Sequence, residues 1–173
     1  EKAELFQFLH LTFQEFLAAR YLVKHRDEEP LPSLVPHIAD PWWREALLLL
    51  HGYAASDHPP FAGRYLRWLS EQEGEDEARL AGLELAGAAL LEQDPRQKER
   101  CHQQAEAILE VLTDAVADIT GPTRGRAGNT LAELGDPRTA VTTLDGMEFC
   151  LVPKGPFWMG SGPDEEDASD DEK

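Results

Sequence analysis

Cysteine is scarce in this sequence, and its two copies, Cys101 and Cys150, lie far apart. Disulfide-stabilised small domains and thiolate metal centres need several cysteines at short spacings, so the sequence favours neither class. Long hydrophobic runs are also missing. The longest aliphatic stretch is 46–50, far below the roughly 20 residues that a membrane span needs. We therefore expect no membrane segment and a reducing, cytoplasmic location.

Positive charge is in short supply, because 16 Lys and Arg residues face 33 Asp and Glu residues, giving a net charge of −17. Such a surface repels phosphate backbones and anionic lipid headgroups. We expect no direct binding of nucleic acid or membranes. The acid-rich segment 164–172 lacks the ligand spacing of a calcium loop, and the histidines show no metal-ligand spacing. No metal site and no catalytic residue are therefore expected.

Helical spacing of apolar residues is the main signal that is present. The short apolar segment 5–9 is typical of a strand. A helix is expected from about 13 to 25, opened by a capping box in which Thr12 and Glu15 satisfy each other's backbone N–H groups. Further helices are expected over 42–55, 61–72, 78–91, about 101–113 and 123–134.

Proline and glycine pairs mark the boundaries between these helices. Asp40-Pro41 and Asp94-Pro95 are typical helix starts, and Pro59-Pro60 introduces another. Gly121-Pro122 is expected to break the chain, and Gly135 suits the left-handed position after a helix. Antiparallel helices joined by such short turns predict a mainly α fold, an α-solenoid of the HEAT/ARM type.

Residues 8–19 read FLHLTFQEFLAA. This segment resembles the F-x-H-x-(S/T)-F-Q-E-(F/Y)-x-A-A signature at the end of the winged-helix region of NACHT-family (STAND) NTPases. The resemblance implies that His10 contacts the phosphate of ADP in the intact NTPase, with ADP or ATP and Mg²⁺ as cofactors there and none in this segment alone. An imidazole beside a helix N-terminus suits phosphate. The alternative is that His10 only satisfies the strand-to-helix corner.

Two further segments resemble the same kind of protein. Residues 40–47 resemble the D-P-x-W-x-E-x-L helix that follows the NACHT module, and residues 124–138 resemble a HEAT-like helix with its G-D-P-R turn. In the second segment Arg124, Arg126 and Arg138 are expected to be solvated or paired with acids rather than to bind anions.

After residue 145 the pattern changes to alternating apolar positions and a Pro-Lys-Gly-Pro turn, which favour strands. The segment 146–161 resembles the opening of the formylglycine-generating-enzyme (sulfatase-modifying-factor) family, G-M-x-F-x-x-(I/V)-P-x-G-x-F-x-M-G-S. This implies a short β segment that begins a C-type-lectin-like domain. Cys150 does not match the family's catalytic position and is expected to be a small core residue.

Together these resemblances predict an interior piece of a longer protein: 1–29 ends a NACHT winged-helix region, 30–143 is a HEAT-like connector, and 144–173 starts a truncated formylglycine-generating-enzyme-like domain. We expect a regulatory connector of a signal-transduction NTPase in bacterial defence or signalling, with no activity of its own. Its partners would be the upstream NTPase module, the downstream lectin-like domain, and other proteins or a self-oligomer. Two alternatives remain: the scaffold of an enzyme whose downstream domain oxidises cysteine to formylglycine or performs related thiol chemistry, and a receptor whose lectin-like domain binds a ligand without catalysis.

Overall fold

The structure is a computed structural model that describes residues 10–28, 30–93, 98–114, 117–147, 149, 151 and 154–155. Within these residues the chain is mainly helical, which confirms the expected mainly α fold class. The helices are α1 (Leu11–Lys24), α2 (Leu31–Leu34), α3 (Arg44–Asp57), α4 (Pro59–Ser70), α5 (Asp76–Gln93), α6 (Lys98–Thr113), α7 (Gly121–Leu134) and α8 (Thr139–Thr142). Two short 3-10 turns, Arg26–Glu28 and Val35–His37, flank α2.

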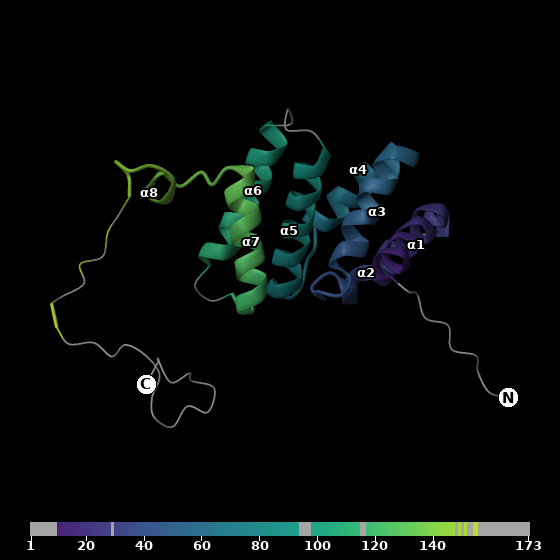
Figure 1. The fold of residues 1–173 in the computed structure, drawn as a ribbon, viewed down its shortest axis with the longest axis horizontal. Coiled ribbons are helices and arrows are strands. Elements are labelled where there is room, and N and C mark those ends of the chain that lie inside the picture. Colours follow the sequence, from purple (N-terminus) through teal and green to yellow (C-terminus); the bar gives the residue numbers. More distant parts are fainter. Residues whose placement is uncertain are drawn as a thin grey trace, which may run out of the picture.

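The helices stack in pairs (Figure 1). Helices α1, α3, α5 and α7 contact one another in that order, while α4 packs against α3 and α5, and α6 packs against α5 and α7. Helix α1 lies at one end of the stack and α7 lies toward the other, with α8 beyond it (Figure 1). Short connections between neighbouring helices, as at 58 and 71–75, make this packing possible.

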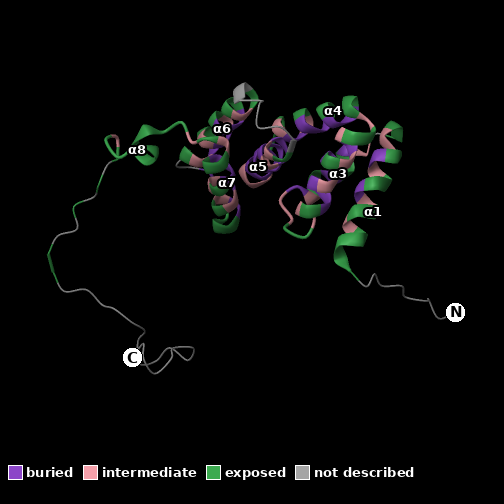
Figure 2. Cartoon of the chain, turned by 45° about the horizontal axis from the view of Figure 1, so that its top comes forward, coloured by how far each residue is buried: buried purple, intermediate pink, exposed green. Residues whose placement is uncertain are grey.

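Helix α5 is the centre of the fold because it is buried on two sides (Figure 2). Leu85 and Ala89 belong to a core shared with α1, α2, α3 and α4, whereas Leu80 and Leu83 belong to a second core shared with α6 and α7. A helix that is apolar nearly all round is stable only when neighbours cover it. The alanine and leucine content of this segment therefore fits its central place.

Two glycines of α5 allow close approach of its neighbours. A Cβ at Gly82 would lie 2.4 Å from the carbonyl oxygen of Leu69 in α4, and a Cβ at Gly87 would lie 2.9 Å from side-chain carbons of Thr130 and Leu134 in α7. No side chain fits at such distances without movement. These glycines therefore set the spacing of α5 from α4 and from α7.

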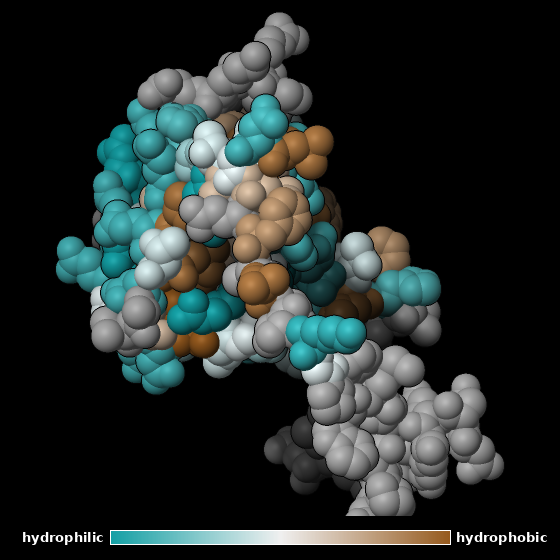
Figure 3. Space-filling model, turned by 90° about the vertical axis from the view of Figure 1, so that its left-hand side faces the viewer, coloured by the Kyte–Doolittle hydropathy of each residue, from teal (hydrophilic) through white to brown (hydrophobic). Residues whose placement is uncertain are grey.

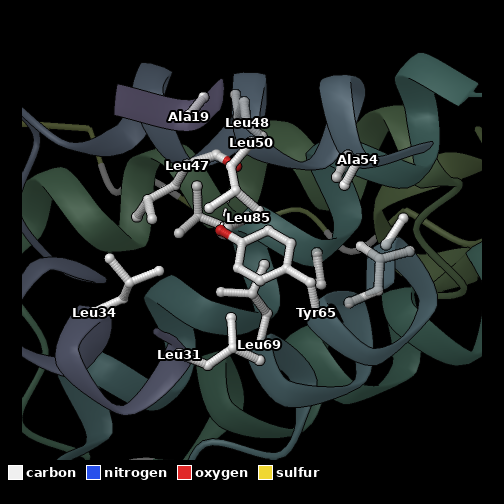
Figure 4. Close-up of a cluster of buried hydrophobic side chains, with 14 of the residues drawn as sticks. Ala19, Leu31, Leu34, Leu47, Leu48, Leu50, Ala54, Tyr65, Leu69 and Leu85 are labelled. Atoms are coloured by element: carbon white, nitrogen blue, oxygen red, sulfur yellow. Dashed lines mark hydrogen bonds between the residues drawn. The ribbon is translucent and has the colours of Figure 1, made fainter. Parts of the chain in front are cut away.

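Tyr65 of α4 fills the larger core, with its ring among Leu47, Leu69 and Leu85 (Figure 4). The phenol is fully buried, and its hydroxyl donates to the carbonyl of Leu47, 3.2 Å away. Burial raises the pKa of Tyr65 far above its usual value. The ring thus ties α4 to α3 without leaving its hydroxyl unpaired.

The capping box expected at Thr12 is wrong. Helix α1 already begins at Leu11, and its N-cap is His10, whose backbone is extended and whose side chain makes no capping hydrogen bond. A capping hydroxyl needs extended backbone at its own residue, whereas Thr12 lies inside the helix. The bond that opens the helix is the one from the Phe13 N–H to the carbonyl of His10.

Other helix starts differ from expectation by two or three residues. Helix α3 begins at Arg44, because residues 41–43 form a turn in which the Asp40 carboxylate accepts the Trp42 N–H at 2.9 Å. Helix α4 begins at Pro59, where His58 Nδ1 accepts the Phe61 N–H at 3.1 Å. Gly121-Pro122 opens α7 rather than breaking the chain, as suits a proline in a first turn.

The end of α7 agrees with expectation, since Gly135 has a φ of +103° directly after Leu134. The strand expected over 5–9 and the start signal at Asp94-Pro95 lie outside the described residues. So does most of the expected β segment after 145. Its described members, at 146, 147, 149, 151, 154 and 155, carry no strand assignment.

Candidate functional site

A polar groove of about 420 Å³ lies where α3, α5 and α7 meet. We call it the α3/α5/α7 groove. Its lining residues are Arg44, Leu48, Glu84, Ala88, Leu91, Glu92, Arg126, Asn129, Thr130 and Glu133. Charged side chains from three helices therefore converge on one surface depression, although no motif in the sequence marks it.

Glu84 is the buried acid of this groove, with 2 % of its surface exposed. Arg44 Nη2 of α3 lies 2.6 Å from Glu84 Oε1, and the hydroxyl of Thr130 in α7 donates to the same oxygen at 3.1 Å. A buried charge is tolerated only when it is paired and hydrogen-bonded. The Glu84 carboxylate of α5 therefore links this helix to both α3 and α7.

The pairing with Glu84 changes the pKa of Arg44. Burial by itself would lower its pKa, but the hydrogen bond and the negative charge of Glu84 outweigh burial and raise the pKa. Its side chain is one-third exposed, at 33 %, and lines the groove. The Arg44 Nε–H is buried without a partner.

A second polar link joins α5 to the start of α7. The Glu77 carboxylate accepts from the Thr120 N–H at 2.8 Å, from the Thr120 hydroxyl at 2.9 Å and from the Thr123 hydroxyl at 2.6 Å. Burial would raise the pKa of Glu77, but these donors outweigh it and lower the pKa. Because Thr120 itself makes no capping bond, Glu77 satisfies the N-terminus of α7 from another helix.

The three arginines singled out in 124–138 have separate roles. Arg138 pairs with Asp136 in its own turn at 2.5 Å, as expected, and this contact holds the pKa of Asp136 below its usual range. Arg124 instead donates to the carbonyls of Leu112 and Ala117 at 3.3 and 3.1 Å, and closes the end of α6. The expectation of solvation or acid pairing is therefore wrong for Arg124, because the unpaired carbonyls at a helix end attract a guanidinium.

Arg126 faces the groove but is already engaged by its own helix. Its Nη2 donates to the Thr123 hydroxyl at 2.9 Å, and its charge helps to lower the pKa of Glu77. By contrast, Glu92 and Glu133 on the groove rim are exposed, and the described contacts give neither an ion pair. Three acids thus face two arginines in the groove, and the negative charge of Glu92 also helps to raise the pKa of Arg44.

His10, the expected phosphate ligand, lies away from this groove at the start of α1. It is exposed, and its ring packs edge-on against Phe13 with centroids 5.9 Å apart. Thr12 is also exposed, and Glu15 is half-buried. The described structure therefore leaves the His10 ring accessible but brings no other polar side chain of the motif onto it.

The two cysteines are the remaining candidate residues. Cys101 is half-buried and free, and Cys150 lies outside the described residues. Among the described side chains no group of His, Cys, Asp and Glu has the arrangement of a metal site. Over the same residues, no helix has both the length and the apolar character that crossing a bilayer requires.

Sequence reasoning missed Glu84 and its two partners. Arg44 and Thr130 lie 40 and 46 residues from Glu84 in the chain, so no local spacing connects them. The one available signal was an acid in the middle of the apolar segment 78–91, since such a position is buried only when a partner is supplied.

No protein-family model matches this chain. Comparison with curated proteins and with solved structures also finds no match.

Proposed function

We propose that this chain is a regulatory connector in a NACHT-type signal-transduction NTPase, joining an upstream nucleotide-sensing module to a downstream formylglycine-generating-enzyme-like domain. The observation that supports this most directly is the exposure of apolar side chains at both ends of the helix stack. Terminal repeats of an isolated solenoid carry a polar outer face. Apolar ends instead suit a segment that continues into further structure.

At the α1 end, one face of the helix packs on α3 through Ala19 and Val23. The other face exposes large apolar side chains: Leu11 at 49 %, Phe13 at 61 %, Leu17 at 43 % and Tyr21 at 60 %. These positions recur at helical spacing and belong largely to the NACHT-like motif. We assign this face to the upstream NTPase module, because the same segment carries the resemblance to it.

At the other end, the face that Figure 3 shows carries hydrophobic and hydrophilic residues side by side. Val141 and Leu144 are 50 % and 87 % exposed there. They directly precede the segment that resembles the formylglycine-generating-enzyme family. This end is the natural contact for that downstream domain.

Between the two ends the stack is suited to transmit a displacement. Helix α5 takes part in both cores, and Glu84 and Glu77 bond across to α3 and α7. Packed cores respond to a shift at one end as units rather than by continuous deformation. A change of nucleotide state at α1 would thus reach α7 through α3 and α5.

The proposal is tested at His10 in the intact NTPase, whose upstream module would supply the site for ADP and Mg²⁺. We expect His10→Ala to weaken ADP retention by about one to two orders of magnitude, since one hydrogen bond to a charged phosphate contributes roughly 1.5–3 kcal/mol. ADP dissociation from the purified full-length protein measures this. Basal activation should rise in parallel.

Thr12→Ala is the matched control, because Thr12 is exposed on the same first turn. It should leave ADP retention unchanged. Equal ADP retention in His10→Ala and the wild type would contradict the nucleotide role and leave His10 as a helix-start residue only.

A further inference from the structure

We infer that Phe13 is a positioning residue for His10, because its ring packs on the imidazole and holds it in the orientation that meets the ADP phosphate. Phe13 acts through the histidine and does not itself contact the nucleotide. Its role therefore rests on the nucleotide contact proposed above for His10. It adds the side chain on which the orientation of that histidine depends.

The imidazole of His10 is not held by the helix that it precedes. His10 is the N-cap of α1, with extended backbone at φ −128° and ψ 129°, yet its side chain makes no capping hydrogen bond. The ring is also exposed. An exposed side chain without such a bond samples several rotamers unless a neighbour packs on it. The orientation of His10 thus depends on what packs against its ring.

The described ring contact of His10 is with Phe13. The two centroids lie 5.9 Å apart at an interplanar angle of 62°, an edge-to-face geometry that aromatic pairs favour. The backbone keeps the pair together, since the Phe13 N–H donates to the His10 carbonyl at 3.2 Å. Helical side chains lean toward the N-terminus of their helix. The Phe13 ring therefore covers the residue that opens α1.

The same ring belongs to the exposed apolar face of α1, where Phe13 is 61 % exposed. A side chain held in its bound orientation loses less freedom when its ligand arrives and so binds it more tightly. Docking of the upstream module on this face would cover the Phe13 ring and restrict the His10 ring with it. One side chain thereby links the docking of the module to the retention of ADP.

The test is a double-mutant cycle on the rate of ADP dissociation from the full-length NTPase. Phe13→Leu removes the ring but keeps an apolar side chain on the docking face, and we expect ADP to dissociate about three- to tenfold faster. Phe13→Tyr keeps the ring and should stay close to the wild type. In the His10→Ala background, Phe13→Leu should change the rate less than about 1.5-fold, because a positioning residue has no effect without its histidine.

Tyr21→Leu is the matched control, since it removes another ring from the same face of α1. Tyr21 stacks on His25, with centroids 3.9 Å apart, rather than on His10. Any effect that it has through docking should be the same factor with and without the His10 side chain. An effect of Phe13→Leu that is equally large in both backgrounds would show that Phe13 acts through docking alone, and would overturn the inference.

The remaining outcomes separate this inference from the proposed function. If His10→Ala speeds ADP dissociation while Phe13→Leu leaves it at the wild-type rate, the positioning role is wrong and the nucleotide role stands. If His10→Ala has no effect, both roles are wrong.

The ring contact is also measured without nucleotide, by NMR of the 173-residue chain. An aromatic ring shifts the resonances of the protons that it faces. Phe13→Leu should therefore move the ring-proton resonances of His10, whereas Tyr21→Leu should move those of His25. Unchanged His10 resonances in Phe13→Leu would show that the two rings do not meet in solution and that Phe13 does not position the histidine.

Discussion

His51 is a buried titratable group on α3, 1 % exposed, with both ring nitrogens lacking a described partner. Burial, with a smaller contribution from the charge of Arg100, lowers the pKa of His51 from 6.5 to about 4. The unfolded chain therefore takes up a proton near pH 6.5, while the folded chain does so only near pH 4. Between these values the unfolded state binds more protons, so stability falls as the pH falls.

This predicts a specific effect of His51→Leu. The wild type should lose up to about 3 kcal/mol of unfolding free energy through this group between pH 6.5 and pH 4, at about 1.4 kcal/mol per pH unit. The variant should lack that loss. Urea unfolding at pH 7 and pH 5 measures the difference between the two proteins.

His102→Leu is the control for the His51 experiment, since His102 is exposed and its described ion-pair partner is Glu106 of its own helix. Its pH dependence should match the wild type. If His51→Leu shows the same acid sensitivity as the wild type, the histidine is hydrated or partnered in solution, and the burial argument is incorrect.

The longer helices were predictable because the spacing of their apolar residues and the glycine signal at 135 are local. The short helices α2 and α8 were not expected, and the Asp94-Pro95 signal lies outside the described residues. The first residues of the helices were harder to predict. The side chain that caps a helix can come from an unexpected residue, such as His58, or from another helix, as Glu77 does for α7. The groove was not predictable. Glu84, Arg44 and Thr130 meet only after α3, α5 and α7 have packed together.

The close approach of α5 to α4 at Gly82 predicts the effect of a substitution on α5. Gly82→Ala should destabilise the fold by about 1–3 kcal/mol, because the new Cβ would lie 2.4 Å from the Leu69 carbonyl oxygen. This cost exceeds the gain of up to about 1 kcal/mol that alanine brings to a helix. Denaturant unfolding of the wild type and of Gly82→Ala measures the sign and size of the change in unfolding free energy.

Gly52→Ala on α3 is the matched control, since nothing lies within 4 Å of a Cβ there. It should stabilise the fold by about 0.5–1 kcal/mol through helix propensity. A stabilising effect of Gly82→Ala would show that α4 moves aside without cost, and that the close approach does not constrain the pair.

The molecule as a whole should unfold as one unit, because α5 contributes to both cores. Repeat proteins are stabilised by the interfaces between neighbours, and weak interfaces let one end open alone. Here the same helix is covered by α3 and α4 and by α6 and α7. Loss of the second core would expose apolar side chains of α5 and remove its contacts on that side.

Leu131→Ala tests this coupling from the far side of the molecule. Leu131 of α7 is 1 % exposed in the second core, so its truncation should cost about 2–5 kcal/mol. The tryptophans Trp42, Trp43 and Trp68 lie on the α3 and α4 side, and Trp158→Phe as a common background removes the fourth. Tryptophan fluorescence and far-UV circular dichroism should then shift together to the same lower urea midpoint. A fluorescence midpoint that stays at the background value, while part of the helical signal is lost earlier, would show that the two cores unfold separately and that α5 does not transmit between them.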